Sequence, residues 1–285
     1  MQFPKTKLID LPSGEASFLE AGSASGEVVL LLHGGGLDCA SLSWRRLIPE
    51  LVSDYRIVAP NWPGYGETAP FGRPYKIDDI GAWLIEFLDH MKIESASIIG
   101  VSMGAGASLW CAIHHPDRVK ALVPVGTYGV ASKAPYHLLS FLLTKLPLNA
   151  ISYGFMRRSP KMLRRALASI FADPNQITDE VLSEVAGVLA NAGAGEAFTN
   201  FQRGEMTATG LRTDLSTQMR DIRQPTLFIH GREDSLVPLS SVERAASSMP
   251  NARVQIMDAG HWPMRERPDE FNKLAHRFLK SAASQ

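Results

Sequence analysis

The sequence lacks most features that mark metal-binding, nucleic-acid-binding or nucleotide-binding proteins. Its two cysteines, Cys39 and Cys111, form neither a C-x-x-C pair nor a zinc-ligand spacing. Lysine plus arginine equals aspartate plus glutamate, 29 against 29, so the chain as a whole has no charge surplus to attract nucleic acid or an anionic membrane. Neither glycine-rich phosphate-binding motif, G-x-G-x-x-G or G-x-x-x-x-G-K-[ST], occurs. These absences predict no metal, no organic cofactor, and a small molecule as partner.

A targeting segment is not visible either. The first residues, Met1 to Leu8, lack the apolar core of a signal peptide. The long uncharged run from Ser95 to Pro116 could span a membrane by length, but its Gly, Ser and His content and β-branched start favour a buried strand followed by a buried helix. With both cysteines expected as free thiols, we expect a cytoplasmic protein. The sequence leaves open whether the chain forms a homo-oligomer.

What the sequence does contain is an alternation of short apolar strands and helices. A hairpin is expected at 5–11 and 16–20, and buried strands at 28–32, 56–59, 97–101, 119–125, 226–230 and 253–257. Helices are expected at 41–51, 77–90, 104–114, 240–248 and 268–281. Such alternation predicts βαβ crossovers and an α/β fold with a mostly parallel, doubly wound sheet.

The alternation stops between 129 and 217, where only helical patterns occur. Ser159-Pro160, for example, supplies an N-cap followed by proline at the first helical position. An all-helical insert in an α/β chain predicts a cap, or lid, over the carboxyl ends of the strands. We therefore expect a core domain of residues 1–128 and 218–285 and a helical cap subdomain of residues 129–217.

The most informative motif is Gly100-Val-Ser-Met-Gly104, a G-x-S-x-G turn that follows a buried strand and begins a helix. Such a turn forces its central residue to a positive φ and lifts the hydroxyl clear of the sheet, while the glycines prevent collisions where strand and helix fold back. The pattern makes Ser102 a candidate nucleophile. A glycine-rich helix start with an incidental serine is the alternative, so Ser102 needs partners.

A serine nucleophile needs a general base and an acid that orients it. Of the eight histidines, His261 lies in a glycine-preceded loop after the last strand, at the sheet edge where ligands approach. Asp234, directly after the strand that ends near 230, is the favoured acid, and Glu233 and Asp258 are its rivals. The resulting order of Ser102, Asp234 and His261 is that of an α/β-hydrolase.

The developing negative charge on a substrate oxygen needs hydrogen-bond donors that are already in place. The backbone amide of Met103 supplies one donor. The other is expected from the loop His33-Gly-Gly-Gly36, with Gly35 favoured and Gly36 as the alternative.

Taken together these motifs resemble the α/β-hydrolase superfamily over nearly the full length. The resemblance is strongest to the branch of meta-cleavage-product (carbon–carbon bond) hydrolases and related serine esterases. The matching stretches are His33–Gly36, Pro63-Gly-Tyr-Gly66, Gly100–Gly104, His115-Pro-Asp-Arg-Val119, Gly231-Arg-Glu-Asp234 and Gly260-His-Trp262. The resemblance implies a catalytic triad, an oxyanion hole and an inserted helical cap.

Three positions depart from that branch. Asn61 replaces the usual aspartate before the Pro-Gly turn, as an exchange of one loop-bracing side chain for another. Val101 precedes the nucleophile where carbon–carbon hydrolases typically have asparagine, and apolar Val185 falls near the cap arginine that binds the substrate carboxylate.

The departures favour a carboxylesterase-like enzyme that cleaves small to medium, largely apolar esters through an acyl-enzyme. A carbon–carbon bond hydrolase, a lactonase or a perhydrolase using the same triad remain alternatives. The non-enzymatic alternative is a ligand receptor that keeps the hydrolase fold.

Further side chains are candidates for the substrate pocket. Trp262, beside His261, either lines the pocket or packs its loop. Arg157, Arg158, Lys161, Arg164 and Arg165 form a basic run that either captures an anionic substrate or is a solvated helix face, the second being favoured. The apolar candidates for the pocket wall are Leu37, Val130, Phe155, Met156, Phe171, Phe198, Met206 and Val237.

Overall fold

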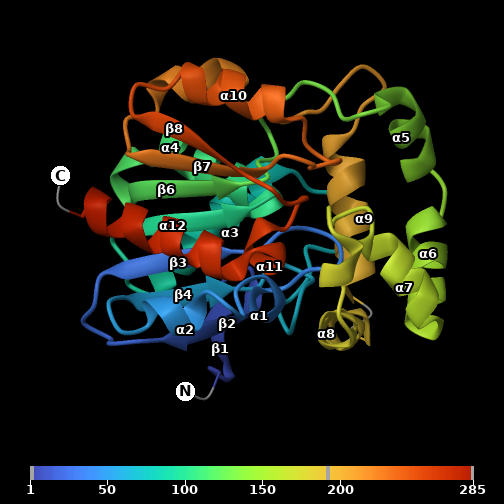
Figure 1. Cartoon of the computed structure of the whole chain (residues 1–285), viewed down its shortest axis with the longest axis horizontal. Coiled ribbons are helices and arrows are strands. Elements are labelled where there is room, and N and C mark those ends of the chain that lie inside the picture. The colour runs from blue at the N-terminus through green and yellow to red at the C-terminus, as the bar shows by residue number, and fades with distance from the viewer. Residues whose placement is uncertain (1–2, 191–192, 284–285) are drawn as a thin grey trace.

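The computed structural model describes residues 3–190 and 193–283, and an eight-stranded sheet forms its centre (Figure 1). The strand order is β1-β2-β4-β3-β5-β6-β7-β8. β1 and β2 form the expected edge hairpin, β2 is also antiparallel to β4, and all other neighbouring strands are parallel. The strands are β1 (Thr6–Leu11), β2 (Gly14–Ala21), β3 (Val28–Leu32), β4 (Arg56–Pro60), β5 (Ala96–Val101), β6 (Val119–Val125), β7 (Thr226–Gly231) and β8 (Ala252–Met257). The mostly parallel α/β sheet is confirmed.

Helices cover both faces of the sheet, which explains why its strands are apolar throughout. In β3, Leu30 and Leu32 pack in the core beneath α3 and α4, while Val29 and Leu31 pack on the opposite face with α1, α2 and α12. This follows from the alternation of side chains along a strand. The helices are α1 (Ala40–Ser43), α2 (Ile48–Leu51), α3 (Ile77–His90), α4 (Met103–His114), α10 (Leu239–Ser247), α11 (Pro263–Glu266) and α12 (Pro268–Ala282).

A second group of helices lies between β6 and β7 in sequence and together beside one end of the sheet (Figure 1). Within this group α6 packs against α7, α8 and α9. In the described part of this stretch the only β-pairing is the isolated bridge between Met206 and Leu211. Its helices are α5 (His137–Thr144), α6 (Leu148–Arg158), α7 (Pro160–Leu167), α8 (Asp179–Ala190) and α9 (Gly193–Glu205). This position is that expected of a cap, and the boundaries at 129 and 217 stay a prediction.

The described residues also include three short 3₁₀ turns. They are η1 (Pro116–Arg118), η2 (Pro174–Gln176) and η3 (Ser216–Asp221).

The helix expected at 41–51 is wrong as a single element. The structure has two one-turn helices there, α1 and α2, with a break from Trp44 to Leu47. Pro49 is the physical reason, because its ring would collide with the carbonyl of Arg45 in a continuous helix and it has no amide to donate. It is tolerated near the start of α2, where the first amides have no helical acceptor.

Gly81 in α3 lies where this helix packs closely against α4. A Cβ at Gly81 would lie 2.1 Å from Cε3 of Trp110 in α4. That ring cannot easily move, because its Nε1 donates to Asp78 at 2.8 Å and it stacks on His114. We expect Gly81→Ala to lower the free energy of unfolding by about 1–3 kcal/mol through overpacking, despite the better helix propensity of alanine.

Gly187 in α8 is the matched control, since a Cβ there would meet nothing within 4 Å. Gly187→Ala should raise stability by up to about 1 kcal/mol through helix propensity. Urea unfolding of both variants measures the difference. Equal effects of the two substitutions would contradict the packing argument.

Candidate active site

Ser102 lies on the turn that joins β5 to α4, in the strained conformation that the motif predicts. Its φ is 53° and its ψ is −114°. A Cβ at Gly100 would lie 2.4 Å from the carbonyl oxygen of Gly104, and one at Gly104 would lie 2.3 Å from that of Leu32. The amide of Ser102 donates to the carbonyl of Val125 at 2.8 Å, which ties the turn to β6. The positive φ and the need for both glycines are therefore confirmed.

Asp234 and His261 come together from the loops after β7 and β8. His261 Nδ1 lies 2.7 Å from Asp234 Oδ2, and the Asp234 side chain is fully buried. The other carboxylate oxygen accepts hydrogen bonds from the amides of Leu236 at 2.8 Å and Val237 at 3.0 Å. Burial alone would raise the pKa of Asp234, but these hydrogen bonds and His261 outweigh it and hold the pKa below its usual value.

The two rival acids are placed elsewhere. The Asp258 side chain is 79% exposed and pairs with Arg232 at 3.0 Å, and Glu233 is exposed. Asp234 is thus the one of the three carboxylates that bonds to His261.

Two residues that sequence analysis did not single out shape this pair. Gly126, at the end of β6, has a φ of 49°, and a Cβ there would lie 2.9 Å from His261 Nδ1 and 3.3 Å from Asp234 Oδ2. His230 is fully buried behind the pair, with Nε2 at 3.7 Å from Asp234 Oδ2 and 3.1 Å from the carbonyl of Val237. Burial lowers the pKa of His230. A glycine directly after a buried strand is the signal that could have pointed to Gly126.

The glycine loop after β3 lines the same cavity as Ser102, and its three glycine amides differ in their partners. The Gly34 amide donates to Asp38 Oδ2 at 2.7 Å, and the Gly36 amide donates to the hydroxyl of Tyr65 at 3.0 Å. In the described part of the chain, the amides of Gly35 and Met103 have no protein acceptor. This arrangement favours Gly35 over Gly36 as an oxyanion donor.

His33 fixes the direction of the same loop. Its Nδ1 donates to the carbonyl of Gly34 at 2.7 Å, and its Nε2 accepts from the amide of Trp62 at 3.0 Å. The indole of Trp62 donates back to the carbonyl of His33 at 2.7 Å. Burial lowers the pKa of His33 to about 3, which matches a neutral ring that donates from one nitrogen and accepts on the other.

Asn61, next to Trp62, acts as the expected brace. Its Oδ1 accepts from the amide of Ala40 at 2.9 Å, and its Nδ2 donates to the hydroxyl of Ser17 at 2.9 Å.

A cavity of about 330 Å³ opens onto Ser102 and His261. Val237 and Trp262 line it as expected, and so do Phe198 and Met206. Its wall also includes residues that sequence analysis had not proposed, such as Phe201, which comes from α9. The apolar lining comes from both the sheet loops and the inserted helices.

Several proposed wall residues do not line this cavity. Phe155 is 57% exposed on α6, and Leu37 is packed in the core beside α1, so neither is among the lining residues. Val130 instead lines a smaller hollow that shares Tyr128 and Val237 with the main cavity. Met156 and Phe171 also lie outside the lining, where Phe171 packs edge-on against Trp262. The periodicity of a sequence reports burial but not which buried surface faces a cavity.

The charges at the cavity are unlike those expected for binding an anion. Of the described residues that line it, none is lysine or arginine, so the basic run from Arg157 does not reach it. Among the described lining residues, Glu205 carries the carboxyl group. This side chain is buried and accepts hydrogen bonds from the amide of Ile77 and from the amide and hydroxyl of Thr213. Val185 is fully buried in the core and supplies no wall.

The cavity also offers no metal site. In the residues that the structure describes, no three His, Cys, Asp or Glu side chains are grouped to hold a metal ion.

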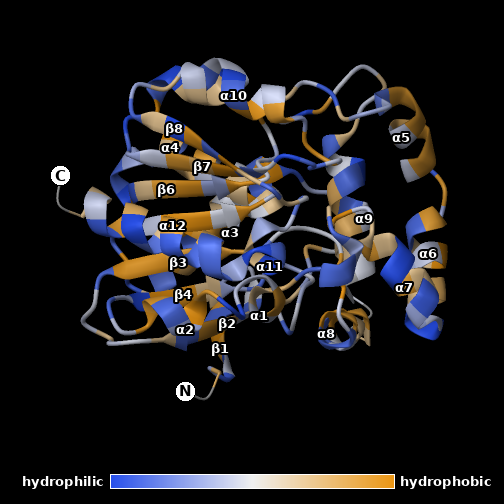
Figure 2. Cartoon of the chain, viewed as in Figure 1, coloured by the Kyte–Doolittle hydropathy of each residue, from blue (hydrophilic) through white to orange (hydrophobic). Residues whose placement is uncertain are grey.

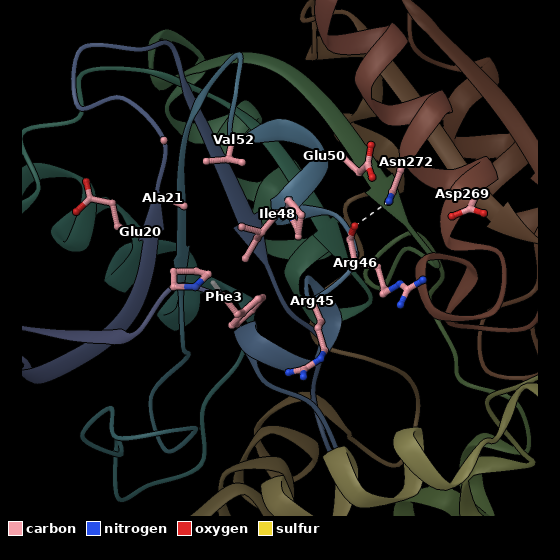
Figure 3. A pocket seen from close by; sticks show the side chains of 13 residues that line it. Phe3, Glu20, Ala21, Arg45, Arg46, Ile48, Glu50, Val52, Asp269 and Asn272 are labelled. Atoms are coloured by element: carbon pink, nitrogen blue, oxygen red, sulfur yellow. Dashed lines mark hydrogen bonds between the residues drawn. The ribbon is translucent and has the colours of Figure 1, made fainter. Parts of the chain in front are cut away.

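A larger hollow of about 610 Å³ lies elsewhere, between the N-terminal segment, α2 and α12 (Figure 3). It shares no lining residue with the cavity at Ser102. Its charged residues are of both signs, and Arg45 is already engaged with Glu184 at 2.7 Å and with the ring of Phe3. Size alone therefore does not identify the chemical site.

Asp38 is a buried carboxylate that braces the glycine loop after β3 and makes stability depend on pH. Burial raises the pKa of Asp38 to about 6, although Ser43 and the amides of Gly34 and Cys39 all donate to it. Because the unfolded pKa is about 3.9, the native state binds more protons between these values, and stability falls as the pH rises from about 4 to about 6. Asp38→Asn should remove this slope, worth up to about 3 kcal/mol.

Asparagine has one hydrogen-bond acceptor fewer than aspartate, so the variant should be less stable at every pH. The test is therefore how the free energy of unfolding changes with pH, and not its absolute value. Urea unfolding of both proteins across this pH range measures it. Parallel curves would show that Asp38 does not titrate there.

Comparison with known proteins agrees with this geometry. The sequence model of a family described as alpha/beta hydrolase fold matches residues 27–268. The chain is 30% identical over 259 residues to a 2-hydroxy-6-oxo-2,4-heptadienoate hydrolase of Pseudomonas putida, covering 90% of each protein. It is 31% identical over 265 residues to a 2-hydroxymuconate semialdehyde hydrolase of a Pseudomonas species, covering 91% of this chain and 89% of the relative.

A solved structure is similar over almost the whole chain. The meta-cleavage product hydrolase from Pseudomonas fluorescens IP01 superposes with a TM-score of 0.80 at 27% identity, covering 98% of each chain. The fold and the resemblance inferred from the motifs are confirmed, and the chain belongs to the alpha/beta hydrolase family.

Proposed function

We propose that this hydrolase works through a Ser102–His261–Asp234 triad and an acyl-enzyme. The observation that carries the proposal is the 2.7 Å contact between His261 and the buried Asp234, together with the cavity that His261 and Ser102 both line. A buried carboxylate that accepts from Nδ1 holds the imidazole in the tautomer whose Nε2 can take a proton.

Each step then uses a group that the fold already holds in place. Ser102 Oγ attacks the substrate carbonyl carbon while His261 Nε2 removes its proton, and Asp234 stabilises the imidazolium. The amides of Met103 and Gly35 stabilise the oxyanion. His261 returns the proton to the leaving group, and a water activated by the same histidine releases the acid. We further propose that residues 129–217 act as a lid over this cavity.

The first candidate for the bond cleaved is a carbon–carbon bond. The comparisons favour it over ester cleavage, because one relative is named as a hydrolase of a heptadienoate, another as a hydrolase of 2-hydroxymuconate semialdehyde, and a well-matched solved structure as a meta-cleavage product hydrolase. The same triad would attack the ketone of such a substrate.

A carboxylic ester is the second candidate, and one observation favours it. A dienoate carries a carboxylate, yet the described cavity lining holds no lysine or arginine and does include the buried Glu205. Burying an unpaired anion beside this acid would be costly. An uncharged, largely apolar ester avoids that cost. A lactone or a perhydrolase substrate would be handled by the same groups.

Substitution of the triad tests the mechanism. Ser102→Ala should lower kcat by a factor on the order of 10⁶, because the nucleophile is lost. Asp234→Asn should lower it by about 10⁴, because the imidazole loses its orientation and its counter-charge. Asp258→Asn is the matched control and should leave kcat near the original value. A larger loss from Asp258→Asn than from Asp234→Asn would mean that the acid is wrongly assigned.

A paired substrate assay decides between the two bonds. We expect a p-nitrophenyl ester series of increasing acyl length and a 2-hydroxy-6-oxo-dienoate to be cleaved by the same site, with both activities lost in Ser102→Ala. A higher kcat/KM for the dienoate supports carbon–carbon cleavage, and a higher value for an ester supports the second candidate. Single-turnover release with retained product would instead point to a ligand receptor.

A further inference from the structure

The helices α5 and α6 expose an unusual apolar surface. Eight Leu, Ile and Phe side chains between 138 and 155 are exposed on these two helices and the turn between them. Figure 2 shows hydrophobic colour along α5 and at the start of α6, at the edge of the molecule away from the sheet. The most exposed are Leu138, Leu139, Leu142, Leu146, Ile151 and Phe155, each between 48% and 60%. Contiguous apolar surface of this kind marks an interaction site.

The charge of the same segment has one sign. Residues 131–171 contain three lysines and four arginines and no aspartate or glutamate, although the whole chain is balanced. Arg164 is paired with Asp179 of α8. Arg158, Lys161 and Arg165 are exposed, and among the described residues none of these three pairs with a carboxylate. The even total charge therefore conceals a group of exposed cations on α6 and α7, two helices that pack against each other, and α6 also packs against α5.

We propose that the α5–α6 face and the adjoining cations of α6 and α7 dock on an anionic lipid surface. Helices that lie in a membrane interface typically combine exposed leucine, isoleucine and phenylalanine with lysine and arginine. Their apolar side chains enter the acyl boundary, and their cations contact the lipid headgroups. A second copy of the chain fits less well, because face-to-face pairing would bring two basic surfaces together.

The geometry indicates a peripheral contact. In the described residues, no single helix is long and apolar enough to span a bilayer. Only α5 and α6 taken together have the required length and apolar composition, and these two helices are bent by 81° relative to each other. The docked face is next to the cavity, because Ala134 and Pro135, just before α5, and Ser140 within it line the cavity wall. An apolar substrate dissolved in the lipid would then enter without crossing water.

Vesicle binding tests the proposal without relying on catalysis. The full chain, with and without Ser102→Ala, is sedimented with vesicles of phosphatidylcholine alone or phosphatidylcholine mixed with phosphatidylglycerol. We expect binding to the mixed vesicles, weakened by salt, and equal binding by Ser102→Ala. If the unchanged chain does not bind the mixed vesicles, the proposal is wrong, whatever the outcome of the hydrolase assays.

Two sets of substitutions locate the surface. Each exposed cation is expected to contribute about a fivefold factor, so Arg158→Gln, Lys161→Gln and Arg165→Gln together should weaken binding about a hundredfold. Leu139→Ser, Leu142→Ser and Phe155→Ser together should weaken it roughly tenfold or more. All six side chains are exposed, so folding should be retained, which the thermal unfolding midpoint checks.

The matched control removes three exposed cations elsewhere, Lys5→Gln, Arg223→Gln and Lys273→Gln, and should bind like the unchanged chain. Equal binding by all three variants would overturn the assignment of this face. A dimer that the serine substitutions convert to a monomer would also overturn it, by assigning the face to a second copy.

Discussion

The site depends on a carboxylate that the fold buries completely. Asp234 has no exposed side-chain surface, and an isolated buried anion would be protonated or would destabilise the fold. Two backbone amides and the imidazole of His261 surround it instead, at 2.7 to 3.0 Å. The loops after β7 and β8 meet around this charge. Gly126 leaves room for the imidazole, and the pair can form only where both loops reach the same end of a parallel sheet.

Buried carboxylates also attach the inserted helices to the core. Glu205 of α9 accepts from the amide of Ile77 at the start of α3, at 2.8 Å. Glu266 of α11 accepts from the amides of Gly260, Ala172 and Asp173 at 2.6 to 3.1 Å. The amide of His261 itself donates to the carbonyl of Ile170 at 2.7 Å. The inserted segment is thus hydrogen-bonded directly to the histidine loop, and its movement would be transmitted to the proposed base.

Much of the fold could be predicted from the sequence, because local patterns determine it. The apolar stripe at 77–90 and the buried run at 119–125 have the bounds that the structure shows. The elbow at Ser102 was predictable because only two closely spaced glycines permit that turn. The break in the helix at 41–51 was not predicted, because the periodic apolar pattern there suggests one continuous helix. In the structure the steric effect of Pro49 prevails over that pattern.

The substrate side of the site was much less predictable. Phe155 and Phe198 look alike in sequence, but one is exposed on α6 and the other lines the cavity, since tertiary packing decides which face each helix turns inward. The choice between Gly35 and Gly36 depended on a distant partner, the hydroxyl of Tyr65. Likewise the total charge gave no indication of the basic and apolar surface on α5–α7.

Covalent labelling tests the central claim most directly. The chain is treated with an excess of an alkyl p-nitrophenyl phosphonate, which reacts with activated serines, and is then analysed by intact-mass and peptide mass spectrometry. The account predicts one adduct per chain, on the peptide that contains Ser102, formed much more slowly in Asp234→Asn. An unlabelled chain, or an adduct on another residue, would contradict the assignment of Ser102 as the nucleophile.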